Sequence, residues 1–167
     1  MNKKTRMKKI IAITALLLTF ISASAQSGKS IYQKYSDADS ISAVYISPAM
    51  FRLMGKLPDM NVEGKDVNLT PIIKSLTGLY LIDSQNPEVN ATLSKEVERL
   101  ISKGRYEMLM EAKDNGETVR IYTDGTETVV NSFVMIAVDG PETTFICLDG
   151  KMNREDLEKA IASKMKD

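Results

Sequence analysis

The chain contains no histidine, and Cys147 is its only cysteine. Without histidine, the Ser-His-Asp and Cys-His forms of nucleophilic catalysis are excluded, and the commonest zinc ligand is missing. A single cysteine also excludes an intramolecular disulfide, even in an oxidising compartment. Because Cys147 lies between Ile146 and Leu148, we interpret it as a small buried side chain rather than a reactive thiol.

Motifs that bind phosphate or metal are also missing. None of the 9 glycines forms the Gly-x-Gly pattern of a phosphate-binding loop. A metal site would have to be built from carboxylates, which suit Ca²⁺ or Mg²⁺. Asp37 and Asp39 lack the glycine and the distal glutamate of a calcium loop, so we interpret them as turn and cap residues. We therefore expect no metal and no cofactor.

Catalysis by paired carboxylates needs two acidic groups close together, about 5 to 9.5 Å apart in glycosidases. Glu107 and Glu111 share one face of a predicted strand and would be about 13 Å apart. They are too far apart to act together. A catalytic pair of carboxylates from two different strands remains an alternative. We predict no catalytic residues and a protein that is not an enzyme.

Residues 1–25 have the pattern of an export signal. The basic head, the apolar run and the small-residue cleavage site are Lys3 to Lys9, Ile10 to Ile21 and Ala23 to Ala25. The apolar run is shorter than the ~20 residues that span a bilayer. We predict cleavage near Ala25-Gln26, no transmembrane segment afterwards, and a periplasmic or secreted protein.

The charge balance changes when this segment is removed. The chain has 22 basic and 22 acidic residues, but residues 1–25 contain only basic ones. The remaining residues 26–167 are net negative, which argues against nucleic-acid binding. Their number fits a single domain with a substantial core.

Four apolar runs separated by turn signals predict an antiparallel meander at the C-terminal end. The runs are Tyr106 to Lys113, Thr118 to Thr123, Thr128 to Val138 and Thr143 to Leu148. The third run is apolar on both faces, so we expect a central, covered strand. In the first run, regular alternation would put Glu107 and Glu111 on a face that meets water.

The preceding part of the chain alternates strands and helices. Two strands are predicted at Ile41 to Ser47 and Leu76 to Asp83, and helices at 26–39, Ala49 to Met54, 87–103 and Asn153 to Met165. Ser47, Asn86 and Asn153 are expected as helix caps. The predicted fold class is α+β: a two-layer sandwich with a mainly antiparallel sheet and helices packed on one face.

Two surfaces are candidates for binding a partner. The first is the helix that contains Met50, Phe51 and Met54 together with the loop after it, because methionine-rich helices form adaptable surfaces. Core packing is the alternative interpretation of these residues. The second surface is the polar face that carries Glu107, Glu111, Arg120 and Tyr122.

Four stretches resemble a family of small exported bacterial proteins known as a domain of unknown function. They are Tyr45 to Phe51, Gly78 to Ile82, Leu109 to Asp114 and Phe145 to Gly150. The resemblance covers essentially all of residues 26–167. It implies an envelope location and a role in envelope sensing, and it implies no established activity or catalytic residues.

We therefore expect an exported, non-catalytic binding or protein-interaction domain of the cell envelope, whose partner is another envelope protein. A small enzyme that uses carboxylates or a Ser-Lys pair is one alternative. A carrier of an apolar ligand held between sheet and helices is another, and a pocket of sufficient volume would be its signature.

Overall fold

The computed structural model describes residues 27–56 and 68–164. Three predicted features lie outside the described residues: the export signal, most of the loop predicted from Lys56 to Asn68, and Met165 at the end of the last helix. No helix of the described part is both long and apolar enough to cross a bilayer.

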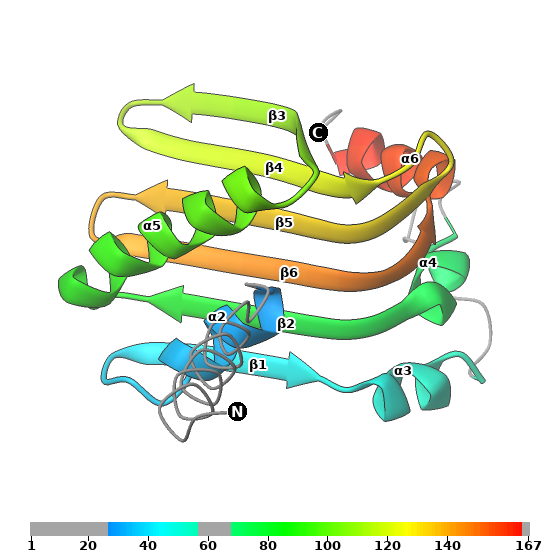
Figure 1. Cartoon of the computed structure of the whole chain (residues 1–167), viewed down its shortest axis with the longest axis horizontal. Helices are drawn as coiled ribbons and strands as arrows, with labels where there is room; N and C mark the ends of the chain where they lie inside the picture. Colours follow the sequence, from blue (N-terminus) through cyan, green and yellow to red (C-terminus); the bar gives the residue numbers. More distant parts are fainter. Residues whose placement is uncertain (1–26, 57–67, 165–167) are drawn as a thin grey trace, which may run out of the picture.

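A six-stranded antiparallel sheet forms the centre of the molecule (Figure 1). Across the sheet, the strands are β1 Ile41–Ile46, β2 Leu76–Ser84, β6 Glu142–Asn153, β5 Val129–Asp139, β4 Glu117–Gly125 and β3 Tyr106–Asp114. The predicted α+β class and the C-terminal meander are confirmed. One long-range pairing, β2 with β6, joins the N-terminal strands to the meander.

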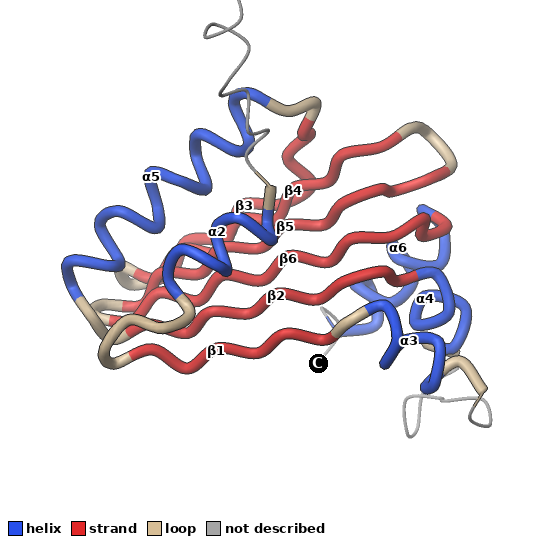
Figure 2. Tube along the Cα trace, turned by 60° about the horizontal axis from the view of Figure 1, so that its bottom comes forward, coloured by secondary structure: helices blue, strands red, loops and turns tan. Residues whose placement is uncertain are grey.

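Helices α2 (Gly28–Tyr35) and α5 (Pro87–Lys103) lie on one face of the sheet, which we call the covered face (Figure 2). Their apolar stripes, including Ile31 and Leu93, pack on side chains that alternate along the central strands. The sheet side of this core consists of Tyr80, Ile82, Val134, Ile136, Phe145 and Cys147. These helices are the second layer of the predicted sandwich.

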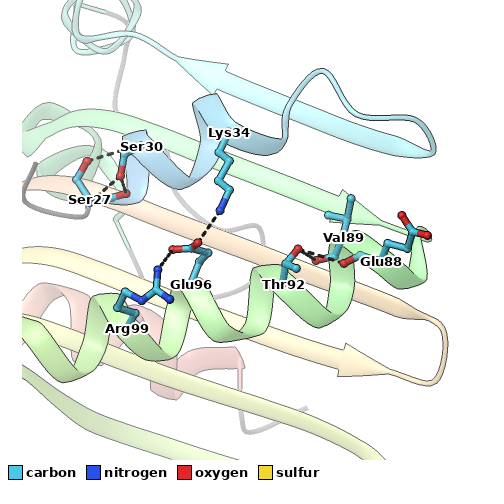
Figure 3. A network of polar contacts seen from close by, with 8 residues as sticks. All are labelled: Ser27, Ser30, Lys34, Glu88, Val89, Thr92, Glu96 and Arg99. Carbon is cyan, nitrogen blue, oxygen red and sulfur yellow. Dashed lines mark hydrogen bonds and ion pairs between the residues drawn. The ribbon is translucent and has the colours of Figure 1, made fainter.

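Polar contacts fix α2 against α5 (Figure 3). Ser27 and Ser30 form a capping box that satisfies the first free amides of α2. Lys34 Nζ lies 2.6 Å from Glu96 Oε1, and Arg99 Nη1 lies 3.2 Å from Glu96 Oε2. The ion pair of Lys34 with Glu96 therefore joins α2 to α5, and Arg99 of α5 holds the same carboxylate from within its own helix.

Three short helices, α3 (Pro48–Met54), α4 (Thr70–Ser75) and α6 (Arg154–Lys164), gather at one end of the sheet (Figure 2). They enclose a second core with side chains of the other face, such as Phe133 and Ile121. The prediction placed the helices on one face, and the structure adds this second group. Helix α4 was not predicted, since six residues are too few to show helical periodicity.

The predicted caps are confirmed. Ser47 Oγ accepts from Met50 N at 3.3 Å, Asn86 Oδ1 from Glu88 N at 3.0 Å, and Asn153 Oδ1 from Asp156 N at 3.2 Å. The last strand runs to Asn153 instead of ending at Leu148. The predicted central strand β5 lies between β4 and β6.

Candidate interaction surface

Helix α3 divides the predicted methionine surface between core and solvent. Phe51 is only 4% exposed and Met54 packs on the second core, whereas Met50 is 47% exposed. Leu53, from the same apolar cluster, is 60% exposed. The accessible part of this surface is therefore Met50 with Leu53, and Phe51 is a core residue.

A bulge at Leu109 divides the second predicted surface. Met108 lies opposite Tyr122, but Met110 lies opposite Ile121, so regular alternation is interrupted. As a result Glu111 pairs with Arg120 on the covered face, whereas Glu107 pairs with Thr123 on the other face. The prediction that all four residues share one face is wrong, because alternation cannot reveal a bulge.

Glu111, Arg120 and Tyr122 stay together on the covered face, next to α5. Arg120 Nε lies 2.6 Å from Glu111 Oε2, and Lys113 Nζ lies 2.9 Å from Glu111 Oε1. Hydrogen bonds from Arg120 and then Lys113 hold the pKa of Glu111 below its ordinary value. This carboxylate is already paired with two cations, which makes it a poor proton acceptor for catalysis.

Glu107 lines an open depression of about 570 Å³ together with Gly125, Thr126, Glu127 and Arg154. The guanidinium of Arg154 is held by other parts of the protein: its Nε donates to Thr126 O at 3.0 Å, and its Nη1 lies 3.9 Å from Glu158 Oε1. The two remaining charged groups are both acidic. The depression therefore offers no matched set of groups for a small ligand.

The face opposite α2 and α5 carries a row of apolar side chains that crosses all six strands. In strand order the row is Val44, Leu81, Ile146, Met135, Ile121 and Met110. Ile121 is buried in the second core, and the half-buried Met135 and Met110 pack against that core. Leu81 and Ile146 are half-buried outside it, and Val44 is 45% exposed. We call this side the open face, because the described helices on this side gather at one end of the sheet (Figure 2).

Polar and small side chains form the next row of the open face. Ser42, Asp83 and Thr144 lie opposite one another, and Thr144 Oγ1 donates to Asp83 Oδ1 at 3.1 Å. The charge of Asp83 raises the pKa of the nearby Glu142 carboxyl. Asp83 and Glu142 come from different strands, so they form the kind of acidic pair that the sequence analysis kept as an alternative. Glu142 lies next to the turn between β5 and β6, and this row forms a polar border beside the apolar one.

Cys147 is fully buried under the first turn of α2. Its sulfur lies 3.6 Å from Ser132 Oγ and 3.5 Å from Asp149 Oδ1. Burial, followed by the negative charge of Asp149, raises the pKa of the thiol. The predicted burial of Cys147 is confirmed, and the raised pKa agrees with the interpretation of its thiol as unreactive.

Two tyrosines on the covered face also stay protonated. Burial raises the pKa of both Tyr80 and Tyr106 to about 12. The hydroxyl of Tyr106 donates to Ser132 Oγ at 3.1 Å. Neither phenol can act as a base near neutral pH, so this polar cluster serves to satisfy buried groups.

The cavity between α5 and the sheet is small. It measures about 30 Å³ and is lined by Ser94, Val97, Glu98, Thr118, Arg120, Ile136 and Val138. That volume holds one or two water molecules. In the described residues, no group of three or more His, Cys, Asp or Glu is placed to hold a metal ion.

Sequence reasoning missed Leu81, Met135 and Ile146 as surface residues. For Met135 the signal was present, since β5 is apolar on both faces, but we interpreted that pattern as a central, covered strand. Among the described residues, helices cover one face along its length and the other at one end. The pattern shows which faces are apolar and not what lies on them.

A family model described as Domain of unknown function (DUF4252) matches residues 35–160, about three quarters of the chain. The resemblance to a domain of unknown function is thereby confirmed, while the exported location stays a prediction. No curated protein and no solved structure matches the chain.

Proposed function

Because the chain belongs to this family of unknown function, we propose from its geometry that it is an exported, non-catalytic protein-interaction domain of the bacterial cell envelope. The partner is another envelope protein, which binds the open face. A role in envelope sensing is part of the proposal and depends on the family resemblance alone.

The observation that supports this proposal is the apolar row on the open face. Leu81, Ile146 and Met135 are as apolar as the buried side chains on the covered face, yet each stays half-buried. Exposed apolar patches with a polar rim are typical of protein-protein contact sites. Here the rim is the row of Ser42, Asp83 and Thr144.

The shape of this surface favours a protein over a small ligand. Ligand pockets are concave and usually hold about 300 to 1,000 Å³ of enclosed space. The apolar row extends across the width of a sheet, and the cavity under α5 measures only about 30 Å³. The depression of about 570 Å³ beside Glu107 is open to solvent and does not enclose a ligand. A broad apolar surface is best matched by another protein surface, and exposed Met50 and Leu53 of α3 could extend it.

The test is native mass spectrometry of the processed protein, released gently from the envelope of its host. We expect a complex whose added mass is that of a second, different protein. The double variant Leu81→Thr/Ile146→Thr should lose that complex, since it makes the row polar while keeping β-favouring side chains. The matched control is Val138→Thr, which makes the same kind of change on the covered face.

Three outcomes would contradict the proposal. Retention of the partner by the double variant would place the contact elsewhere. An added mass of a few hundred daltons would favour the carrier instead. Turnover of a peptide, ester or glycoside, abolished by one acidic substitution such as Glu142→Gln, would establish an enzyme.

A further inference from the structure

We infer that the protein forms a two-fold symmetric dimer in which the β1 strands of two copies pair edge to edge. The two sheets would then form one continuous antiparallel sheet. This dimer uses the edge of the sheet and does not depend on the partner proposed for the open face.

The β1 edge lacks the features that usually protect a free strand edge. Ile41–Ile46 contains no charged residue and no proline, and it pairs with β2 in register without a bulge. Val44 and Tyr45 each expose 45% of their surface. Beyond β1, the described residues provide no further strand. Such an edge is a template for another strand.

The β3 edge at the other side of the sheet has those protective features. It carries Glu107, Glu111 and Lys113, and its pairing is interrupted by the bulge at Leu109. Charges and bulges both oppose edge-to-edge association. Since one edge is protected and the other is not, pairing through β1 would close as a dimer and would not extend into a filament.

The hydrogen-bond alternation of β1 identifies the free backbone groups. Gln85 N donates to Ser40 O at 3.2 Å, so Ser40 faces β2. In an antiparallel ladder, alternate residues face the same neighbour. Ser42 and Val44 therefore also bond to β2, and the amides and carbonyls of Ile41, Ala43 and Tyr45 point outward.

A register centred on Ala43 uses all of these outward groups. Ala43 would lie opposite Ala43 of the second copy, and Ile41 opposite Tyr45, with two hydrogen bonds for each opposed pair. The small side chain of Ala43 at the centre leaves room for close approach. Tyr45 is held in place by stacking on Tyr80, with ring centroids 5.4 Å apart, and aromatic pairs with β-branched residues stabilise adjacent strands.

Charges at the two ends of β1 favour a second copy as the occupant. The turn before β1 carries exposed Asp37 and Asp39, and the segment after it carries exposed Arg52 and Lys56. None of these four side chains forms an ion pair within the described part of the chain. Antiparallel pairing would bring the acidic end of one copy beside the basic end of the other, twice by symmetry. An unrelated strand would have to supply both charges itself.

The first test is the mass of the processed protein in solution, measured by light scattering over increasing concentration. We expect twice the mass of one chain. Ala43→Pro should give the mass of one chain with an unchanged circular dichroism spectrum, because it removes an outward N–H and none that bonds β2. The Leu81→Thr/Ile146→Thr variant should remain dimeric, which separates this inference from the proposed function.

Disulfide trapping supplies a second test in case Ala43→Pro fails to fold. Opposed residues of a hydrogen-bonded pair have Cα atoms about 5.5 Å apart, which fits a disulfide. Ala43→Cys should therefore form a covalent dimer on mild oxidation, and Ala112→Cys, the same change on the exposed β3 edge, should not. A single-chain mass at every concentration, or cross-linking through Ala112→Cys alone, would overturn the inference.

Discussion

The two faces of the sheet have similar apolar composition and different surroundings. On the covered face, Ile82 and Phe145 are fully buried under α2 and α5. On the open face, their sequence neighbours Leu81 and Ile146 are only half-buried. The comparison teaches that the pattern of apolar residues along a strand shows which faces are apolar. It does not show whether a helix, a loop or another protein covers those faces.

The difference follows from where the helices lie. Helix α5 has 17 residues, which at 1.5 Å per residue makes it about 26 Å long. It can cross the strands of the covered face, as Figure 1 shows. The helices on the other side are shorter, with 7 residues in α3, 6 in α4 and 11 in α6. They close one end of the open face and leave the side chains of Leu81 and Ile146 half-buried.

The sharpest way to break this comparison is a pair of substitutions at adjacent positions of β6. Phe145→Ala should lower the free energy of unfolding by about 3 to 5 kcal/mol, because it leaves a cavity under α2 and α5. Ile146→Ala should cost about 1 to 2 kcal/mol, since a half-buried side chain loses less apolar burial. Urea unfolding of the isolated protein measures both values. Equal losses would show that the open face is as well covered as the other.

The sequence predicted the elements of the fold well, because most of its signals are local. Asn86 followed by Pro87 identified the start of α5. Asn115-Gly116, the turn signal between the first two of the four apolar runs, identified the turn between β3 and β4. Asn115 and Gly116 both adopt positive φ, 46° and 94°, as that turn requires. The pairing of β2 with β6 is a long-range contact, so no local pattern could predict it.

The candidate surfaces were predicted less well, because they depend on details beyond periodicity. The bulge at Leu109 moved Glu107 away from Glu111, and the packing of α3 took Phe51 into the core. Neither a bulge nor the packing angle of a short helix follows from the order of apolar and polar residues. The unprotected β1 edge could be seen only after the strand order was known.

The second prediction concerns the contact between α2 and the covered face. A Cβ atom at Gly28 would lie 2.2 Å from Cys147 Sγ and 2.5 Å from its Cβ, too close for a rigid side chain to accommodate. Gly28→Ala should therefore lower the free energy of unfolding by about 1 to 3 kcal/mol, as overpacking does. Thermal and urea unfolding measure the change.

The neighbouring exposed residue provides the control for that substitution. Lys29→Ala makes a change of similar kind in the same helix turn, and its effect should stay within about 0.5 kcal/mol. If Gly28→Ala were neutral or stabilising, through the better helix propensity of alanine, α2 would not be seated directly on β6. The covered face would then resemble the open face more than the structure indicates.

The smallest expected effect is the response of the covered face to alkaline pH. Burial raises the pKa of the Cys147 thiol in the folded protein, so the unfolded chain loses this proton first as the pH rises. Below the pKa of the thiol in the unfolded chain, the buried thiol makes its full contribution to the stability of the folded protein. Above that pKa the contribution is lost, and the free energy of unfolding falls by about 1.5 kcal/mol between pH 8 and pH 10. Urea unfolding at both pH values should show this loss, and Cys147→Ala should lack it.

Tyr80 and Tyr106, whose pKa values are raised to about 12, add a further loss only above pH 10. An equal response in Cys147→Ala would mean that the thiol ionises freely in the folded state, and that α2 does not keep water from this face.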